Sequence, residues 1–95
     1  MVTINEIRES IKDIVSKYPI KKISLFGSYA NGTANQYSDI DLLVEFLPSN
    51  ISLITISSIK SEIEDKLSKK IDIIHGPVDD SSFINIEKVV DIYEQ

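Results

Sequence analysis

The sequence predicts a protein of the α/β (α+β) class, with one small mixed β-sheet and packed helices in a single domain, residues 1–95. Two observations lead to this class. Apolar residues recur at helical spacing in some segments of the chain, and short isoleucine-rich runs occupy others. The expected order is helix, strand, strand, helix, strand, helix, which gives a three-stranded sheet with helices on one face or on both.

The first expected helix begins after Thr3. Thr3 and Glu6 match a capping box, in which each side chain satisfies a free backbone N–H of the other residue. Isoleucine and valine then recur at helical spacing from Ile4 to Val15. The helix should end at Tyr18, because the residue before a proline, here Pro19, is forced out of the helical conformation.

Two strands follow this helix. KISLF, residues Lys22–Phe26, is a short apolar run typical of a buried strand, and DIDLLVEF, residues Asp39–Phe46, is the second candidate. Gly27-Ser28 breaks the first strand, and the segment Asn31–Tyr37 is polar and rich in turn-forming residues. We therefore expect the two strands to be separated by a loop.

The second half of the chain predicts a helix, a third strand and a closing helix. Ile56–Leu67 has the apolar spacing of an amphipathic helix, with the acid-before-base pairs Glu62–Lys66 and Asp65–Lys69 on its outer face. KIDIIH, residues Lys70–His75, is the third strand candidate. Apolar residues spaced along Phe83–Tyr93 predict the last helix.

The overall composition narrows the function classes. The chain has no cysteine, which excludes disulfides, thiolate catalysis and cysteine-ligated metals. No apolar run approaches the roughly 20 residues of a membrane span, and the charged N-terminal segment has no signal-peptide core, so we expect a cytoplasmic protein with no membrane partner. The net charge of −5 argues against strong direct nucleic-acid binding, although a divalent cation can still attach a nucleotide to an acidic protein.

The first candidate site feature is Gly27-Ser28, directly after the first strand. Glycine lets the backbone approach a bulky anion closely, and a helical turn that starts at Ser28 points free N–H groups and the Ser28 hydroxyl at that anion. A phosphate chain is the natural ligand for such a turn. Taken alone, a Gly-Ser pair after a strand more often marks a plain turn.

The second feature is Asp39-Ile40-Asp41 at the start of the second strand. Side chains two residues apart in a strand share a face, so the two carboxylates can hold one Mg²⁺ ion, which prefers oxygen ligands. Ile40 and Leu42 should face the core and fix this register. The alternative is an exposed acidic strand that discourages edge-to-edge aggregation.

The third feature is Asp72, a charged residue inside an isoleucine-rich strand. A buried aspartate without a partner is costly, so Asp72 faces either solvent or a cation. If Asp72 lies beside Asp39 and Asp41, the three carboxylates repel one another unless metal binds them. Such a site could hold Mg²⁺ ions for in-line attack on a phosphorus atom.

Together, these features resemble the signature of the DNA polymerase β-type nucleotidyltransferases, in the stretch LFGSYANGTANQYSDIDLLVEF. More narrowly, the chain is similar to the minimal nucleotidyltransferases (MNT) from its leading helix to VVDIYE. The resemblance implies a nucleotidyltransferase core in which Gly27 and Ser28 bind the nucleotide. It also implies that Asp39, Asp41 and Asp72 are catalytic and bind Mg²⁺, with ATP as substrate.

The same resemblance implies the reaction and the partner. Minimal nucleotidyltransferases pair with an all-helical HEPN toxin, and as antitoxins of this toxin–antitoxin system they can transfer AMP from ATP to a toxin tyrosine. One alternative is a catalytically weak antitoxin that acts by complex formation, because Asn31 stands where the family usually has arginine. Another is nucleotidyl transfer to a small molecule or to RNA. Whether the chain forms a homo-oligomer stays open.

Other positions carry weaker signals. Tyr29 could stack on a base or pack over the first helix. His75, the single histidine of the chain, is expected at the surface rather than in the role of a base. The pairs Lys21-Lys22 and Lys69-Lys70 each precede a strand. They could steer a phosphate or a partner, but two lysines at the start of a strand usually form a solvated edge.

Overall fold

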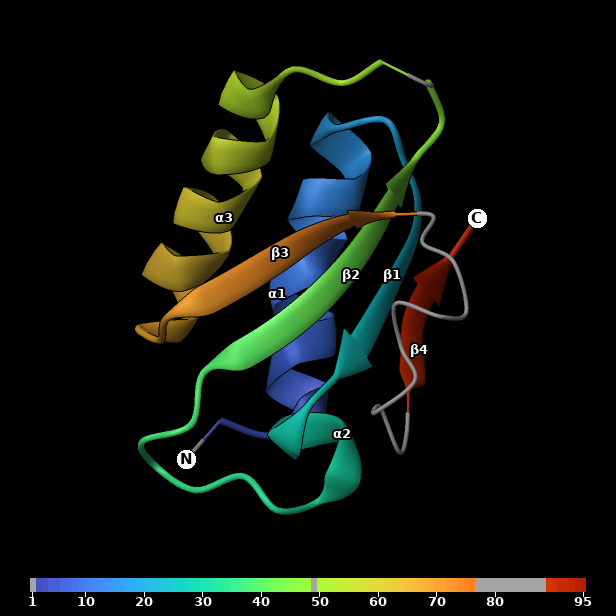
Figure 1. Ribbon diagram of the computed structural model, residues 1–95. Helices are drawn as coiled ribbons and strands as arrows, with labels where there is room; N and C mark the ends of the chain where they lie inside the picture. Colours follow the sequence, from blue (N-terminus) through green and yellow to red (C-terminus); the bar gives the residue numbers. More distant parts are fainter. Residues whose placement is uncertain (1, 49, 77–88) are drawn as a thin grey trace.

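The computed structural model describes residues 2–48, 50–76 and 89–95. Its elements in chain order are α1 (Ile4–Lys17), β1 (Ile20–Phe26), α2 (Ser28–Asn31), β2 (Ile40–Phe46), α3 (Leu53–Leu67), β3 (Ile71–Gly76) and β4 (Val90–Glu94). The strands form a sheet in the order β3-β2-β1-β4 (Figure 1). Strands β2 and β3 run parallel, and the other neighbouring strands run antiparallel. This mixed sheet with packed helices confirms the predicted α/β class.

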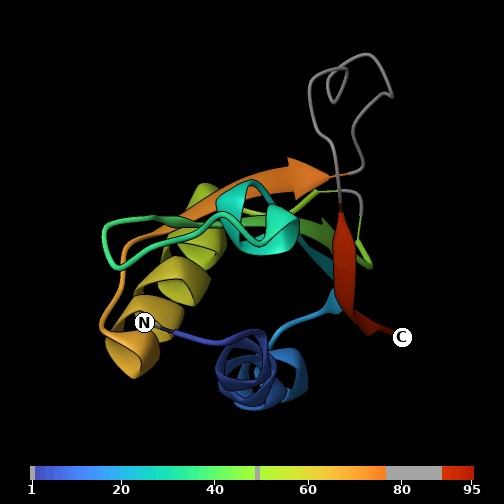
Figure 2. The same ribbon diagram turned by 90° about the horizontal axis from the view of Figure 1, so that it is seen from below.

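Helices α1 and α3 cover the same face of the sheet, whereas the short α2 lies at the end of β1 (Figure 2). The side chains that fill the space between helices and sheet are mostly isoleucines and leucines with no exposed surface: Ile7, Ile14, Ile23, Leu25, Ile40, Leu42, Ile59, Ile63 and Ile71. Burial alternates along β2, so Ile40 and Leu42 face the core as predicted, and Asp41 points to the face without α1 and α3. None of the helices in the described ranges is long and apolar enough to cross a membrane.

The boundaries of α1 follow from local chemistry. The Thr3 hydroxyl accepts a hydrogen bond from the Glu6 N–H at 3.1 Å, and Tyr18 caps the other end in an extended conformation ahead of Pro19. Helix α3 begins earlier than its apolar spacing predicts, because the Ser52 hydroxyl accepts from the Thr55 N–H at 3.1 Å and starts the helix at Leu53. Capping therefore determines where both long helices begin.

The ion pairs of α3 differ from the expected pairing within the helix. Lys66 pairs with Asp13 of α1, with 2.8 Å between Nζ and Oδ2, and Glu62 pairs with Lys17 of α1. The predicted Glu62–Lys66 pair is therefore wrong, because α1 packs alongside α3 and offers each side chain a partner across the helix interface. These contacts tie α1 to α3.

The prediction of a closing helix over Phe83–Tyr93 is wrong from Val90 onward. Val90–Glu94 forms β4, which pairs antiparallel with the outer edge of β1, whereas Phe83 and Ile86 lie outside the described residues. Without β4, the outer edge of β1 would leave backbone N–H and C=O groups without partners. Val90–Glu94 supplies these partners, and its valine and isoleucine favour the strand conformation. The sheet gains a fourth strand for this reason.

Candidate active site

A tight turn at Gly27 connects β1 to α2. Gly27 has φ 75° and ψ −152°, a conformation that side-chain-bearing residues rarely adopt, and its carbonyl accepts from the N–H groups of Ala30 (3.1 Å) and Asn31 (3.0 Å). The N–H groups of Ser28 and Tyr29 precede these bonds and have no partner within the helix. The helical turn predicted to start at Ser28 is therefore present.

Gly27 also lies directly against Asp41. A Cβ atom at Gly27 would lie 2.4 Å from the Asp41 Oδ2, well inside the distance at which such atoms can approach. The absence of a side chain at Gly27 lets the turn after β1 touch a carboxylate of β2. The structure thus brings two of the three predicted site features into contact.

The register of the sheet adds the third feature. Asp41 of β2 is the direct neighbour of Asp72 in the parallel strand β3, and of Phe26 in the antiparallel strand β1. Asp39 lies one residue before β2, which begins at Ile40 rather than at Asp39 as predicted. Gly27, Asp41 and Asp72 therefore meet across three adjacent strands.

The carboxylates of this cluster affect each other. Burial raises the pKa of Asp41 above its ordinary value, and the negative charges of Asp72 and Asp39 and a hydrogen bond with Asp72 raise it further. An ionised Asp41 is disfavoured in this environment unless a positive charge arrives. The electrostatics of the cluster favour a bound cation.

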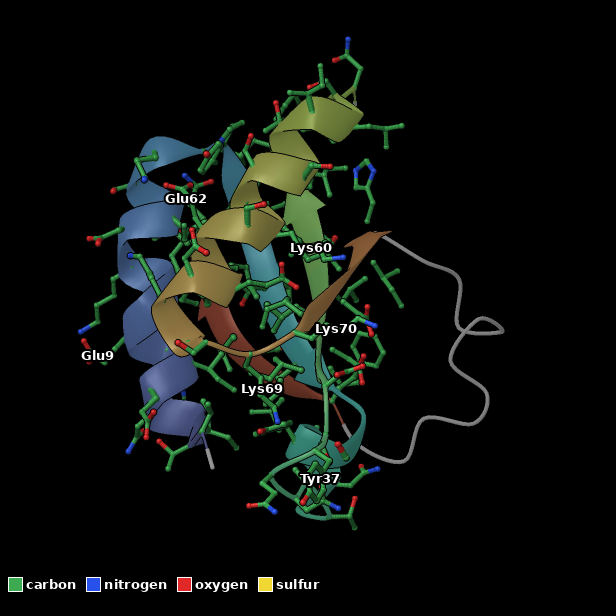
Figure 3. All side chains as sticks on the ribbon, turned by 90° about the vertical axis from the view of Figure 1, so that its left-hand side faces the viewer. Glu9, Tyr37, Lys60, Glu62, Lys69 and Lys70 are labelled. Atoms are coloured by element: carbon green, nitrogen blue, oxygen red, sulfur yellow. The ribbon has the colours of Figure 1, made fainter. Side chains whose placement is uncertain are left out.

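Asp39 already has a cationic neighbour. Its Oδ2 lies 3.9 Å from the Lys70 Nζ, and the two side chains are 43% and 66% exposed, respectively. Lys70 and Lys69 precede β3 (Figure 3). The sequence prediction favoured a solvated edge for this lysine pair over a role in steering a phosphate, and it missed the contact with Asp39. The signal that could have revealed it is the position of Lys70 two residues before Asp72, where strand alternation favours a shared face.

The donor set suits a hard divalent cation. Asp41 and Asp72 are neighbours on strands spaced about 4.8 Å apart, so their oxygens can reach one ion, and Mg²⁺ prefers such ligands. Within residues 2–48, 50–76 and 89–95, however, no three acidic, histidine or cysteine side chains are already arranged to hold a metal. Asp39 would have to exchange Lys70 for the ion to complete a three-carboxylate set.

The side chains of two weaker candidates, Tyr29 and His75, point away from this cluster. Tyr29 is 5% exposed and belongs to the core cluster that includes α1, so it packs against the protein rather than offering a stacking surface. Its hydroxyl has no hydrogen-bond partner in the described parts of the chain. His75 is exposed at the end of β3 and meets the ring of Phe46 edge-on at 5.3 Å.

A Gly-Ser turn after β1, an Asp-x-Asp at the start of β2 and an aspartate on the adjacent parallel strand, all on this mixed sheet, define a nucleotidyltransferase. The chain belongs to the nucleotidyltransferase domain family, whose model matches residues 4–94. It is 41% identical over 73 residues to a Methanocaldococcus jannaschii protein named as a candidate protein adenylyltransferase, a match that covers 77% of each chain.

Solved structures agree on the fold. A toxin–antitoxin complex crystallised with AMP-PNP superposes with a TM-score of 0.74 at 20% identity, over 99% of this chain and 75% of the other. A tri-AMPylated HEPN toxin from Shewanella oneidensis in complex with an MNT antitoxin gives a TM-score of 0.64 at 17% identity, over 97% and 70% of the two chains. The fold therefore agrees with the family match, and a 30% identity over 78% of this chain to the protein adenylyltransferase MntA of Thermococcus cleftensis confirms the resemblance to minimal nucleotidyltransferases.

Proposed function

We propose that this chain transfers AMP from ATP to a tyrosine of an all-helical HEPN toxin and so acts as the antitoxin of the pair. The observation that carries the proposal is the contact of the Gly27 turn with Asp41, which is itself the register neighbour of Asp72. A phosphate-binding turn beside paired carboxylates is what nucleotidyl transfer needs.

Each residue of the cluster has a proposed task. The free N–H groups of Ser28 and Tyr29 and the Ser28 hydroxyl bind phosphate oxygens at the start of α2. Asp39, Asp41 and Asp72 hold Mg²⁺. Bound there, Mg²⁺ would offset the negative charge of the phosphates and make the α-phosphorus more electrophilic.

The reaction forms one bond and breaks one. The tyrosine oxygen attacks the α-phosphorus, the bond to the β-phosphate oxygen breaks, and pyrophosphate leaves. The tyrosine proton passes to a carboxylate beside the attacking oxygen, and Asp72 is the proposed acceptor. Asp72 is suited to this because it is half-buried on the strand next to Asp41.

Related proteins support the acceptor and the partner. A relative at 41% identity is named as a candidate protein adenylyltransferase. A structural neighbour is a complex of an AMPylated HEPN toxin with an MNT antitoxin, and another toxin–antitoxin neighbour contains AMP-PNP. A protein acceptor of this class is therefore favoured over RNA or a small molecule.

The test uses ATP labelled on the α-phosphate. The chain is incubated with Mg²⁺ and the protein encoded by the neighbouring gene, which the proposal expects to be the HEPN toxin, and label on that protein is measured. We expect labelling by the wild type and by Asp65→Ala, which removes an exposed acid of α3, but not by Asp39→Ala combined with Asp41→Ala. Equal labelling by the double variant, or none by the wild type, contradicts the proposal.

A second candidate function follows from α2. This turn has no basic residue, and Asn31 cannot supply the positive charge of the arginine usual in the family. Neutralisation by complex formation alone is the alternative. It is supported if the Asp39 and Asp41 double variant protects cells from the toxin as fully as the wild type does.

A further inference from the structure

The candidate site is rich in negative charge, so a basic residue is needed to offset the charge of a bound polyanion. The site contributes three carboxylates of its own, on a chain of net charge −5, and its proposed ligand is a polyanion. Helix α2 offers backbone N–H groups but no basic side chain. Positive charge for the nucleotide phosphates, beyond that of the divalent cation, must come from another element.

Lys70 is placed to supply it. Its carbonyl accepts a hydrogen bond from the Ile40 N–H at 3.1 Å, which fixes its backbone beside the first residue of β2. Its Nζ lies 3.9 Å from the Asp39 Oδ2. Within the described ranges, this is the one ion pair between a basic side chain and any of the three carboxylates.

Two other lysines near the sheet contact other groups. Lys69 donates to the Gln36 carbonyl at 2.6 Å, toward the loop that carries Tyr37 (Figure 3). Lys22 pairs with Asp91 at 3.5 Å and with Glu94 at 3.8 Å, on the β1–β4 side of the sheet. Lys70 differs from both, because its partner is a carboxylate of the site. Its side chain is 66% exposed, against 27% for Lys22, so it can exchange this partner for another.

We propose that Lys70 binds the phosphates of the nucleotide. It pairs with Asp39 in the free protein, and it contacts non-bridging phosphate oxygens once a divalent cation binds to Asp39. This inference rests on the proposed function of the site. A lysine suits such an exchange, because its ammonium is a compact charge on a flexible stem with three donors.

The exchange predicts effects of opposite sign for two ligands. Lys70 competes with a cation that binds alone, since both need Asp39, but it favours a ligand that brings phosphates with the cation. Removing the charge should therefore strengthen binding of the metal alone and weaken binding of the nucleotide. If Lys70 had a purely structural role, removing its charge would weaken binding of the metal and of the nucleotide alike.

The experiment measures binding by calorimetry on the full chain, with Mn²⁺ alone, with Mg²⁺ and a non-hydrolysable ATP analogue, and with adenosine. For Lys70→Gln we expect about fivefold weaker binding of the analogue and about twofold tighter binding of Mn²⁺, because partly exposed ion pairs have effects of this size. Adenosine binding should not change. Lys70→Arg, which keeps the charge, should restore most of the analogue affinity.

Two matched controls lose a lysine elsewhere. Lys69→Gln removes the neighbour held by Gln36, and Lys12→Gln removes an exposed lysine of α1. Unchanged analogue affinity in Lys70→Gln, weaker binding of both ligands, or an equal loss in Lys69→Gln overturns the inference and leaves the proposed function standing. Failure of the wild type to bind the analogue with Mg²⁺ overturns the proposed function, and the inference with it.

Discussion

Gly27→Ala tests the close approach on which the site depends. Its Cβ would lie 2.4 Å from the Asp41 Oδ2, so the aspartate side chain must move, at a cost of about 1 kcal/mol. The backbone at φ 75° and ψ −152° adds about 1–3 kcal/mol for a residue with a side chain. We therefore expect a loss of about 2–4 kcal/mol in the free energy of unfolding, which lowers the melting temperature by roughly 10–20 °C in a domain of this size.

Gly32→Ala is the matched control for this change. Gly32 also has a positive φ, 78°, but a Cβ there would meet nothing within 4 Å. It should cost about 1 kcal/mol, the penalty of a left-handed conformation alone. Melting is followed by circular dichroism for both variants, at equal protein concentration and without metal.

A double-variant cycle separates the two costs at Gly27. Asp41→Ala leaves only its Cβ near the new methyl group, at an ordinary 3.6 Å, so the contact part of the penalty should disappear in that background. If Gly27→Ala costs no more than Gly32→Ala, or if Asp41→Ala does not reduce its cost, the turn and the carboxylate are not in contact in solution and the reasoning is refuted.

Two further predictions concern electrostatics and packing. Asp41→Asn should raise the melting temperature of the metal-free protein near neutral pH. Burial and the charges of Asp72 and Asp39 raise the pKa of Asp41 above 3.8. The ionised form is therefore less stable in the folded state than in the unfolded state, and Asn removes this penalty. The gain should shrink as pH falls through this raised pKa, where wild-type Asp41 takes up a proton, and a gain that persists below pH 3.8 would contradict this cause. Ile59→Ala, at a side chain with 0% exposure, should lower the unfolding free energy by about 2–4 kcal/mol in urea denaturation. Ile54→Ala, five residues earlier on α3 and 79% exposed, should change it by less than about 0.5 kcal/mol, and equal losses would show that the core is not packed as described.

Local chemistry made much of this protein predictable from its sequence. Helix α1 begins where the Thr3 hydroxyl accepts a hydrogen bond from the Glu6 N–H, and it ends before Pro19. Both effects act between residues a few positions apart in the chain. The inward direction of Ile40 and Leu42 follows from strand alternation, which needs no knowledge of the partner strands. The Gly-Ser turn and the Asp-x-Asp pattern were likewise recognisable within one continuous stretch.

Contacts between distant segments were decided only by the tertiary structure. Val90–Glu94 became a strand because the outer edge of β1 offered it backbone partners, which outweighed a helical spacing of apolar residues. Lys66 pairs with Asp13 of α1 rather than with Glu62 of its own helix, because α1 packs alongside α3. Asp41, Asp72 and Gly27 were predicted from the sequence as separate candidates. They lie close together because β2 and β3 pair in parallel with Asp41 opposite Asp72, and because the turn after β1 places Gly27 against Asp41. The contact of Lys70 with Asp39 depends on the same register, because it joins residues far apart in the chain. The local pattern indicates only that Lys70 and Asp72 share a face.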